Sequence, residues 1–274
     1  MDRVGLIAGT GELPAILASR AVERGKYVVV IRALREPAPM PLPGTVVHDI
    51  FVGEWDRVVR TLKDEGVTRV YLVGKISREH LYARPHFDAR FQAIVAGLKD
   101  RSDDGLVLEF VADLEREGIT VGTQTEYLDH LCFGPGVLTK RVPTPSQWRD
   151  IARGFEVAKG IAALDAGQTA VVKEGGVLAL EAVDGTDRTI RRGCELGRGG
   201  AVVVKVAKPD QDLRFDVPTV GRQTLAAMAE SGGAVLAIEA NATFVVEGRR
   251  FPELAEEFGI CVVSYEPGLE ERMP

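Results

Sequence analysis

Residues 4–14 read Val-Gly-Leu-Ile-Ala-Gly-Thr-Gly-Glu-Leu-Pro, and this stretch decides the fold. Residues 4–8 are an apolar run that predicts a buried strand, and the glycines at 9 and 11 predict a tight turn. Residues 12–24 repeat apolar side chains at helical spacing, which predicts a helix. A strand, a turn and a helix in this order begin a parallel α/β sheet.

The same alternation continues to about residue 130. Three more strands are predicted, at residues 28–31, 70–73 and 119–121. Three more helices are predicted, at residues 55–65, 87–98 and 104–117. Strands that alternate with helices imply a parallel, doubly wound sheet, so residues 1–130 are predicted to form an N-terminal Rossmann-like domain.

The character of the chain changes after that domain. Glycines and prolines punctuate residues 131–147, which predicts a linker. Residues 148–274 are predicted to form a C-terminal mixed-sheet α/β catalytic domain, with a hairpin turn at Glu174-Gly175-Gly176. Its predicted strands are residues 169–173, 177–182, 201–206, 234–239 and 243–247, and its predicted helices are residues 147–164, 222–230 and 252–258.

Composition limits the kinds of protein that this chain can be. The formal net charge of −6 over 274 residues argues against a general nucleic-acid binder, which needs many cationic phosphate contacts. The three cysteines show no metal-binding spacing and are expected to be reduced thiols in a cytoplasmic protein. No signal peptide is apparent, and no apolar run approaches the roughly 20 residues that span a bilayer.

The glycine-rich turn is a candidate phosphate site. Gly9, Thr10 and Gly11 would let the backbone approach a phosphate at the amino terminus of a helix. The dinucleotide fingerprint is incomplete, because Pro14 stands where its third glycine should be. Arg32 ends the second strand in place of an acidic residue, which leaves a small opening for NADP. A tight turn without any ligand is the alternative interpretation.

The strongest local signal is residues 205–221, Lys-Val-Ala-Lys-Pro-Asp-Gln-Asp-Leu-Arg-Phe-Asp-Val-Pro-Thr-Val-Gly. Lys205 and Lys208 follow an apolar strand, at the end where α/β sheets bind ligands. Arg214 and Asp216 are expected on the same side of an extended segment, because side chains alternate along a strand. Cations can hold phosphate oxygens while a carboxylate holds a metal.

A second stretch, residues 181–192, has the same character. Glu181 follows a strand, and Thr186 and Asp187 begin a helix. Asp187 would repel a phosphate at that helix terminus unless a cation lay between them. Helix capping is the alternative role for Thr186 or Asp187.

Weaker candidates lie in the N-terminal half. Lys75 follows the third predicted strand, the pair Asp103 and Asp104 precedes a helix, and Thr123 follows a short strand. Asp104 has helix capping as its alternative role. The four histidines are scattered and form no zinc or triad spacing, so oxygen ligands favour Mg²⁺, with Mn²⁺ as the substitute.

These motifs, taken in order, resemble the LpxI-type UDP-2,3-diacylglucosamine pyrophosphatases over nearly the whole chain. The motifs that carry the resemblance are residues 5–14, Gly74-Lys75, Asp103-Asp104, residues 181–187 and residues 205–221. The resemblance implies two domains with the site between them and Mg²⁺-dependent attack by water at the sugar-side phosphorus. The implied products are UMP and 2,3-diacylglucosamine 1-phosphate, in lipid A biosynthesis. Ser102 and Asp184 depart from the family pattern, which puts fine substrate contacts in doubt.

The resemblance matches Asp216 to the family's metal-associated catalytic aspartate. We expect Asp216, Asp187 and Glu181 to bind the metal, and Lys205 and Arg214 to act with Asp216 in catalysis. The expected substrate-binding residues are Gly9, Thr10, Gly11, Lys75, Asp103, Asp104, Thr123, Thr186, Lys208 and Gln211.

Two alternatives stay open from the sequence: an NADP-dependent reductase, and a non-catalytic nucleotide or lipid-nucleotide binding protein. An acylated substrate is compatible with transient peripheral contact at the inner membrane. The sequence also leaves a homodimer open.

Overall fold

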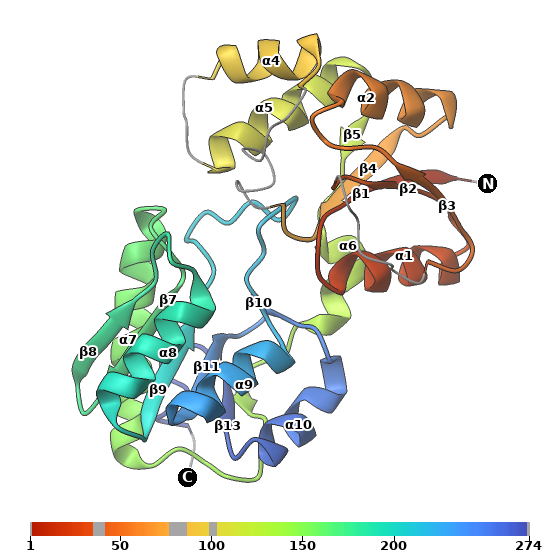
Figure 1. The fold of residues 1–274 in the computed structure, drawn as a ribbon. Coiled ribbons are helices and arrows are strands. Elements are labelled where there is room, and N and C mark those ends of the chain that lie inside the picture. Colours follow the sequence, from red (N-terminus) through yellow and green to blue (C-terminus); the bar gives the residue numbers. More distant parts are fainter. Residues whose placement is uncertain (1, 35–41, 77–86, 99–102, 273–274) are drawn as a thin grey trace. The chain divides into compact units, whose positions relative to one another are not determined.

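The computed structural model describes residues 2–34, 42–76, 87–98 and 103–272, and only the backbone of Asp103. The chain divides into two compact units (Figure 1). Unit 1 comprises Met1–Leu128 together with the short segment Leu213–Phe215, and unit 2 comprises Asp129–Asp212 and Asp216–Pro274.

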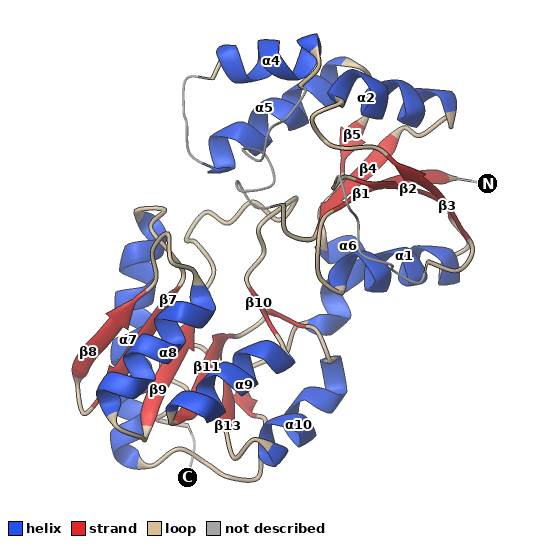
Figure 2. Cartoon of the chain, viewed as in Figure 1, coloured by secondary structure: helices blue, strands red, loops and turns tan. Residues whose placement is uncertain are grey.

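Unit 1 is built on a five-stranded parallel sheet with the order β3-β2-β1-β4-β5. Helices α1 and α6 lie on one face of the sheet, and α2, α4 and α5 lie on the other (Figure 2). The strands are β1 (Arg3–Ala8), β2 (Tyr27–Arg32), β3 (Thr45–Asp49), β4 (Arg69–Val73) and β5 (Thr120–Val121). The helices are α1 (Leu13–Glu23), α2 (Trp55–Asp64), α4 (Ala89–Ala96), α5 (Asp103–Arg116) and α6 (Thr125–Leu128).

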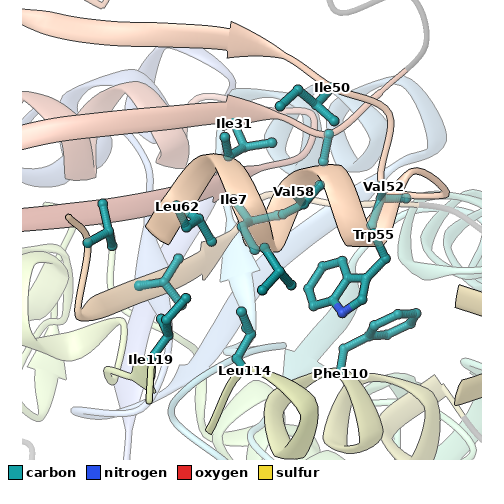
Figure 3. Packing of buried hydrophobic residues seen from close by; sticks show 14 of the residues in the cluster. Ile7, Ile31, Ile50, Val52, Trp55, Val58, Leu62, Phe110, Leu114 and Ile119 are labelled. Carbon is teal, nitrogen blue, oxygen red and sulfur yellow. The ribbon is translucent and has the colours of Figure 1, made fainter. Parts of the chain in front are cut away.

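The core of unit 1 forms between the sheet and helices α2 and α5. Trp55 and Leu62 of α2 and Leu114 of α5 are almost fully buried against Ile7 and Ile31 of the sheet (Figure 3). Trp55 meets Phe110 edge to face, with ring centroids 4.6 Å apart. Burying side chains of this size stabilises the unit by about 2 kcal/mol each.

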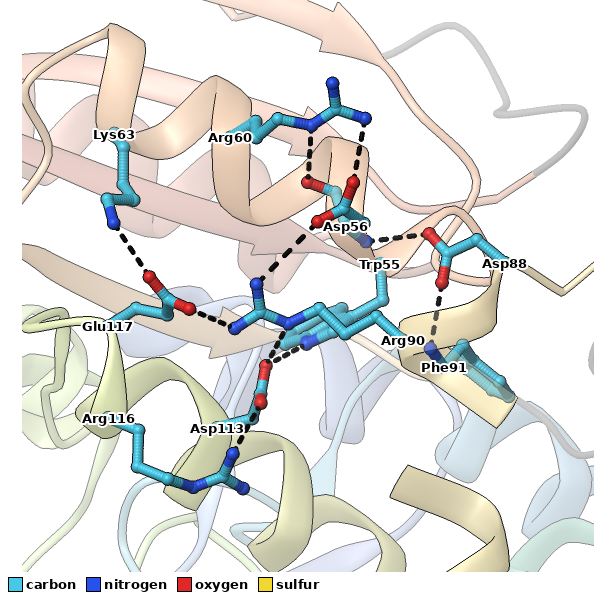
Figure 4. Close-up of polar contacts among 10 residues, drawn as sticks. All are labelled: Trp55, Asp56, Arg60, Lys63, Asp88, Arg90, Phe91, Asp113, Arg116 and Glu117. Carbon is cyan, nitrogen blue, oxygen red and sulfur yellow. Dashed lines mark hydrogen bonds and ion pairs between the residues drawn. The ribbon is translucent and has the colours of Figure 1, made fainter. Parts of the chain in front are cut away.

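A polar network fastens α2, α4 and α5 to one another (Figure 4). Asp113 of α5 is buried and accepts hydrogen bonds from the Trp55 indole nitrogen at 2.8 Å and from Arg90 Nε at 2.8 Å. Arg90 of α4 also donates to Glu117, which pairs with Lys63 on its other oxygen. A buried carboxylate needs such partners, because an unpaired charge in the interior is costly.

Unit 2 is built on a six-stranded mixed sheet with the order β6-β13-β11-β9-β7-β8. Helix α7 packs on one face, and α8, α9 and α10 pack on the other. The strands are β6 (Gly136–Val137), β7 (Thr169–Lys173), β8 (Gly176–Leu180), β9 (Ala201–Lys205), β11 (Gly233–Glu239) and β13 (Cys261–Tyr265), and a separate pair joins β10 (Thr219–Val220) to β12 (Phe244–Val245). The helices are α7 (Pro145–Ala163), α8 (Thr186–Gly197), α9 (Arg222–Ser231) and α10 (Phe251–Glu257). Short 3-10 turns lie at Asp129–Leu131 and Gly248–Arg250.

The predicted fold class, a parallel Rossmann-like sheet followed by a mixed-sheet α/β region, is confirmed. The sequence analysis missed β3 and β13, although β13 is completely buried. Part of the segment predicted as a linker, residues 131–147, forms β6, which pairs antiparallel with β13.

The prediction that residues around Arg214 and Asp216 are extended was wrong. The chain turns at Leu213 and Arg214, and Asp216 adopts a positive φ of 54°. Side chains therefore do not alternate along this segment, and strand geometry does not place Arg214 and Asp216 on the same side.

The Asp113 network gives a stability test for unit 1. Replacing Asp113 with alanine is expected to lower the free energy of unfolding by about 3 kcal/mol, because the buried Trp55 donor and Arg90 both lose their acceptor. The chain has two tryptophans, so a Trp148→Phe background leaves Trp55 fluorescence to report on unit 1 during urea unfolding.

The matched control is Lys63→Ala, which breaks a half-exposed pair with Glu117. It should change the free energy of unfolding by about 0.5 kcal/mol. Equal losses in the two variants would mean that burial of Asp113 does not matter.

Candidate functional site

The candidate site of unit 2 lies at one edge of its sheet. Strands β8 and β9 are both antiparallel to β7, and β11 is parallel to β9, so all three end at the same edge. Glu181 follows β8, Lys205 ends β9 and Glu239 ends β11. Open α/β sheets bind ligands at the carboxyl ends of such strands.

Lys205 is buried at this edge, with 7% of its surface exposed. Its ammonium donates to the Thr186 hydroxyl at 2.8 Å, and that hydroxyl donates to Glu181 Oε1 at 2.7 Å. The direction of the second bond follows from the first, because an ammonium only donates. The two bonds link a buried cation to its counter-charge through a single hydroxyl group.

Glu181 is held in its charged form. Burial alone would raise the pKa of this carboxyl, but the positive charge of Lys205 and the hydrogen bonds from Thr186 and the Gln168 backbone outweigh it. The pKa of Glu181 is therefore lower than usual. A charged Glu181 is thus the counter-charge to the buried Lys205 ammonium.

Lys208 forms the second part of the site. Its ammonium lies 2.7 Å from Asp165 Oδ1 and 3.4 Å from Asp216 Oδ2. Its backbone N–H donates to Gln211 Oε1 at 3.2 Å. The Lys208 side chain is 15% exposed and that of Asp216 is 56% exposed, so the lysine is enclosed while the aspartate faces solvent.

Gln168 connects the two parts, and the sequence analysis did not find it. Its backbone N–H donates to Glu181 Oε2 at 3.1 Å, and its side-chain nitrogen donates to Gln211 Oε1 at 3.0 Å. The chain after β9 is held from the other side by Glu239, which accepts from the Ala207 N–H at 2.8 Å and pairs with Lys159 at 2.7 Å.

The structure therefore brings together six of the predicted residues in unit 2: Glu181, Thr186, Lys205, Lys208, Gln211 and Asp216. It adds Asp165, Gln168, Lys159 and Glu239. One signal in the sequence pointed to Gln168. The predicted hairpin makes the strand that begins at residue 169 antiparallel to its neighbour, so residue 168 lies at the end of the sheet where the neighbouring strand ends.

The glycine-rich turn of unit 1 has a structural role. The Gly9 N–H donates to the Val73 carbonyl and the Thr10 N–H to the Lys75 carbonyl, both at 2.9 Å. A Cβ on Gly9 would lie 2.6 Å from the Lys75 carbonyl oxygen, so β1 and β4 meet too closely for any side chain. These two N–H groups are hydrogen-bonded within the protein. Gly11 has a φ of 96° and open space where a Cβ would lie, so it is the residue of the turn whose backbone a ligand could approach.

Other features of unit 1 bear on nucleotide binding. Arg32, the residue that left an opening for NADP, donates two hydrogen bonds to Asp49 at 2.5 and 2.7 Å. Asp49 therefore competes with a 2′-phosphate for two of the five Arg32 donors, which counts against the NADP alternative. Thr123, after β5, accepts a hydrogen bond from Thr125 at 3.2 Å. Lys75 follows β4.

Arg214 belongs to a different unit from the lysines with which it was grouped. The Gln124 N–H donates to the Leu213 carbonyl at 2.8 Å, and Arg214 pairs with Glu115 of α5 at 3.5 Å. The segment Leu213–Phe215 is thus part of unit 1, whereas Asp216 is part of unit 2. Asp104 lies at the start of α5, the side chain of Asp103 is not described, and Ser102 lies outside the described residues.

The predicted metal ligands Asp216, Asp187 and Glu181 do not form a cluster that could hold a metal ion. Within the ranges that the structure describes, no three His, Cys, Asp or Glu side chains gather to hold a metal ion. Asp187 is exposed in the first turn of α8, and both carboxylate oxygens of Glu181 accept hydrogen bonds. Mg²⁺ is usually held by one or two carboxylates together with substrate phosphates, and the half-exposed Asp216 fits that arrangement.

Two family models match the chain. The LpxI N-terminal domain matches residues 3–131, and the LpxI C-terminal domain matches residues 134–263. UDP-2,3-diacylglucosamine pyrophosphatase LpxI of Caulobacter vibrioides is 34% identical in an alignment of 280 residues. The alignment covers 97% of this chain and 99% of the relative.

The chain belongs to the LpxI family. The resemblance inferred from the sequence motifs is confirmed, and the two LpxI domains correspond closely to the two halves of the chain.

Two solved structures share weaker similarity with this LpxI-family chain. CobK precorrin-6A reductase is 17% identical, with 95% of this chain and 98% of that chain covered and a TM-score of 0.32. N5-carboxyaminoimidazole ribonucleotide synthetase from Thermotoga maritima is 17% identical, with 67% and 42% covered and a TM-score of 0.25.

The lowered pKa of Glu181 predicts how stability depends on pH. A carboxyl whose pKa is lower in the folded protein stabilises it above the unfolded value of 4.5, and this stabilisation is lost as the pH falls through the folded pKa. Glu181→Gln should therefore unfold at lower urea concentration than wild type at pH 7. The difference should shrink as the pH falls below 4.5.

Trp148 fluorescence in a Trp55→Phe background follows unit 2 in this experiment. The control is Glu195→Gln, at an exposed position of α8, which should follow the wild-type pH dependence. A difference between wild type and Glu181→Gln that stays constant from pH 7 to pH 3.5, or grows in acid, would contradict the charged state assigned to Glu181.

Proposed function

We propose that this chain hydrolyses the pyrophosphate of UDP-2,3-diacylglucosamine to UMP and 2,3-diacylglucosamine 1-phosphate, a step in lipid A biosynthesis. The observation that carries the proposal is the full-length match to the pyrophosphatase of Caulobacter vibrioides. That match also confirms the prediction that the chain is an enzyme. The cations and carboxylates at the sheet edge of unit 2 supply the chemistry that the reaction needs.

The lysines act on the charge of the substrate. Two bridged phosphates carry negative charge, which moves to the leaving oxygen as the bond breaks. Lys205 donates one of its three ammonium hydrogens to Thr186 and can donate others to phosphoryl oxygens, and the Lys208 ammonium is the second proposed phosphate contact. Thr186 and Glu181 fix Lys205, and Asp165 fixes Lys208, so little reorganisation is needed during the reaction.

Asp216 is assigned to the attacking water. Its carboxylate faces solvent 3.4 Å from the Lys208 ammonium, so it can accept a hydrogen bond from a water beside a bound phosphate. Water adds to the sugar-side phosphorus, the bond from that phosphorus to the bridging oxygen breaks, and UMP leaves with that oxygen. Arg214, Gly11, Lys75, Asp104 and Thr123 stay predicted substrate contacts from unit 1.

We propose in addition that the reaction depends on Mg²⁺, with Mn²⁺ as the substitute. Asp216 would hold the metal, and the remaining ligands would be substrate phosphates and water. A bound divalent ion would neutralise charge on both phosphates. Asp187 and Glu181 stay predicted supporting carboxylates, although Glu181 acts in this structure through Thr186 on Lys205.

One further proposal concerns contact with the membrane, and one prediction concerns the oligomeric state. None of the helices in the described part of the chain combines the length and hydropathy needed to cross a membrane. Transient peripheral contact with the inner membrane is proposed from the acyl chains of the substrate. A homodimer stays a prediction.

The proposed reaction is tested by UMP release from UDP-2,3-diacylglucosamine, with Mg²⁺ and with EDTA. Asp216→Ala should lower turnover at least about 100-fold, because the water loses the group that orients it. Asp210→Ala is the matched control, since it removes an exposed carboxylate from the same loop and should keep turnover within about twofold of wild type.

Circular dichroism should show that both variants are folded. Near-normal UMP release by Asp216→Ala would refute the role of Asp216. No release by folded wild-type protein that still binds the substrate would favour the non-catalytic binding alternative.

Because the predicted carboxylate ligands do not form a cluster, we predict that the metal binds together with the substrate. Mn²⁺ alone should bind only at about millimolar concentration, because one or two carboxylates with water make a weak site. Addition of UDP should tighten binding at least about tenfold, and Asp216→Ala should remove that gain. Electron paramagnetic resonance of unbound Mn²⁺ measures this without turnover. Micromolar binding of Mn²⁺ by the protein alone would show that a complete site exists before the substrate arrives.

A further inference from the structure

One buried residue at the sheet edge of unit 2, Ala207, has both of its backbone groups held by charged side chains. Its N–H donates to Glu239 Oε2 at 2.8 Å, and its carbonyl accepts from the Lys159 ammonium at 3.0 Å. The same ammonium lies 2.7 Å from Glu239 Oε1. The three contacts close a ring, and each of them involves a charged group, which makes such hydrogen bonds stronger than neutral ones.

The two side chains of this ring come from regular elements. Glu239 is the last residue of β11, and Lys159 lies about one turn before the end of α7. Ala207 follows β9 in a stretch without helix or strand. The pair therefore ties a loop residue both to a strand of the sheet and to a helix that covers the sheet.

The ring fixes the peptide bond that leads to Lys208. The Ala207 carbonyl and the Lys208 N–H belong to one planar group. Lys159 holds the carbonyl, and the N–H donates to Gln211 Oε1 at 3.2 Å. This plane directs the Lys208 side chain, whose ammonium lies 2.7 Å from Asp165, two residues beyond the end of α7. The end of one helix thus holds both the backbone before Lys208 and its charged group.

We propose that Lys159 and Glu239 are positioning residues, which hold the Ala207 peptide so that the Lys208 ammonium meets a phosphoryl oxygen. The proposal rests on the proposed function, because Lys208 is assigned there to phosphate contact. Neither Lys159 nor Glu239 has to touch the substrate in this role. The role requires a side chain at position 239 that accepts a hydrogen bond on each of two oxygens, and a substitution of the same shape can remove one acceptor.

Glu239→Gln keeps the shape of the side chain but leaves one oxygen for two donors, the Ala207 N–H and the Lys159 ammonium. The new NH₂ group must face one of these donors, and two donors repel each other. The ring should therefore open. Loss of a negative charge at the sheet edge would by itself favour an anionic substrate. A fall in activity in this variant is thus opposite to the effect of charge alone.

The first test measures kcat/KM for UMP release. Glu239→Gln should lower kcat/KM at least about tenfold, because Lys208 no longer meets the charge on the phosphates. In a Lys208→Met background the same substitution should change kcat/KM by no more than about twofold, since the group that the ring places is absent.

A double variant tests the conflict between the two donors. Lys159→Met/Glu239→Gln should recover at least about threefold of the kcat/KM lost in Glu239→Gln, because the single oxygen is then left to the Ala207 N–H. Charge alone predicts the opposite, since removing the Lys159 ammonium should weaken an anionic substrate further.

The matched control is Glu256→Gln. Glu256 has the same local chemistry, because it accepts the Lys140 N–H at 2.8 Å on one oxygen and lies 3.3 Å from the Lys140 ammonium with the other. It is in α10, just before the start of β13, at the edge of the sheet opposite to the candidate site. Glu256→Gln should keep kcat/KM within about twofold of wild type.

The second test needs no turnover. Acetylation by an N-hydroxysuccinimide ester, followed by mass spectrometry, measures how readily each lysine reacts. The Lys208 side chain is 15% exposed, so it should react slowly in the wild type. Glu239→Gln should raise its rate at least about fivefold relative to Lys63 of unit 1, because local opening exposes it. The rate of the buried Lys205 should not change, and Glu256→Gln should leave both rates as in the wild type.

An unchanged acetylation rate of Lys208 in Glu239→Gln overturns the proposal, whether or not the protein hydrolyses the substrate. An equal rise at Lys205 also overturns it, because the pair would then only stabilise unit 2. A loss of kcat/KM that persists in the Lys208→Met background, or that deepens when Lys159→Met is added, overturns it as well. Absence of wild-type turnover together with the expected acetylation refutes the proposed function and leaves the positioning of Lys208 supported.

Discussion

The candidate site depends on a lysine that the sheet buries. Lys205 ends a strand whose other residues are fully apolar and buried, so its ammonium is enclosed at the sheet edge. A buried charge without a partner would shift to its neutral form or destabilise the unit. Thr186 and Glu181 supply the partners of Lys205: Glu181 follows β8 and Thr186 begins α8. Fixing Glu181 also fixes Gln168, and with it the loop that carries Lys208 and Gln211.

The glycine-rich turn illustrates how one motif serves two physical needs. Gly9 and Gly74 stand where β1 and β4 approach too closely for a Cβ, and the backbone donors of Gly9 and Thr10 close that contact. The same residue pattern would suit a phosphate, which is why the sequence suggested one. Close packing of two strands explains the glycine at 9, and the positive φ of Gly11 explains the other. Glycines in a βα turn are therefore weak evidence for a ligand by themselves.

The sequence predicted the fold class because strand and helix periodicities differ, and most elements lie within a few residues of their predicted places. It missed β13, whose five residues follow a short helix with only a glycine turn to announce them. The residues grouped around Lys205 were found because charged side chains follow apolar strands. Gln168, Asp165 and Lys159 were not found, because each is a single polar residue whose partner is distant in sequence. The positive φ of Asp216 and the packing of Leu213–Phe215 with unit 1 depend on tertiary contacts that no local pattern carries.

The charges at the candidate site of unit 2 bear on how a metal ion could bind there. The Lys205–Glu181 pair is neutral, and Lys208 faces both Asp165 and Asp216, so these five described groups together carry one negative charge. A pyrophosphate that approached this edge alone would meet that charge, and like charges at close range cost free energy. The proposed divalent cation, arriving with the phosphates, would reverse the sign of this interaction and would give Asp216 a partner of higher charge than Lys208. Under the proposed Mg²⁺ dependence, the excess carboxylate among these five groups would favour the metal-bound substrate over the metal-free one.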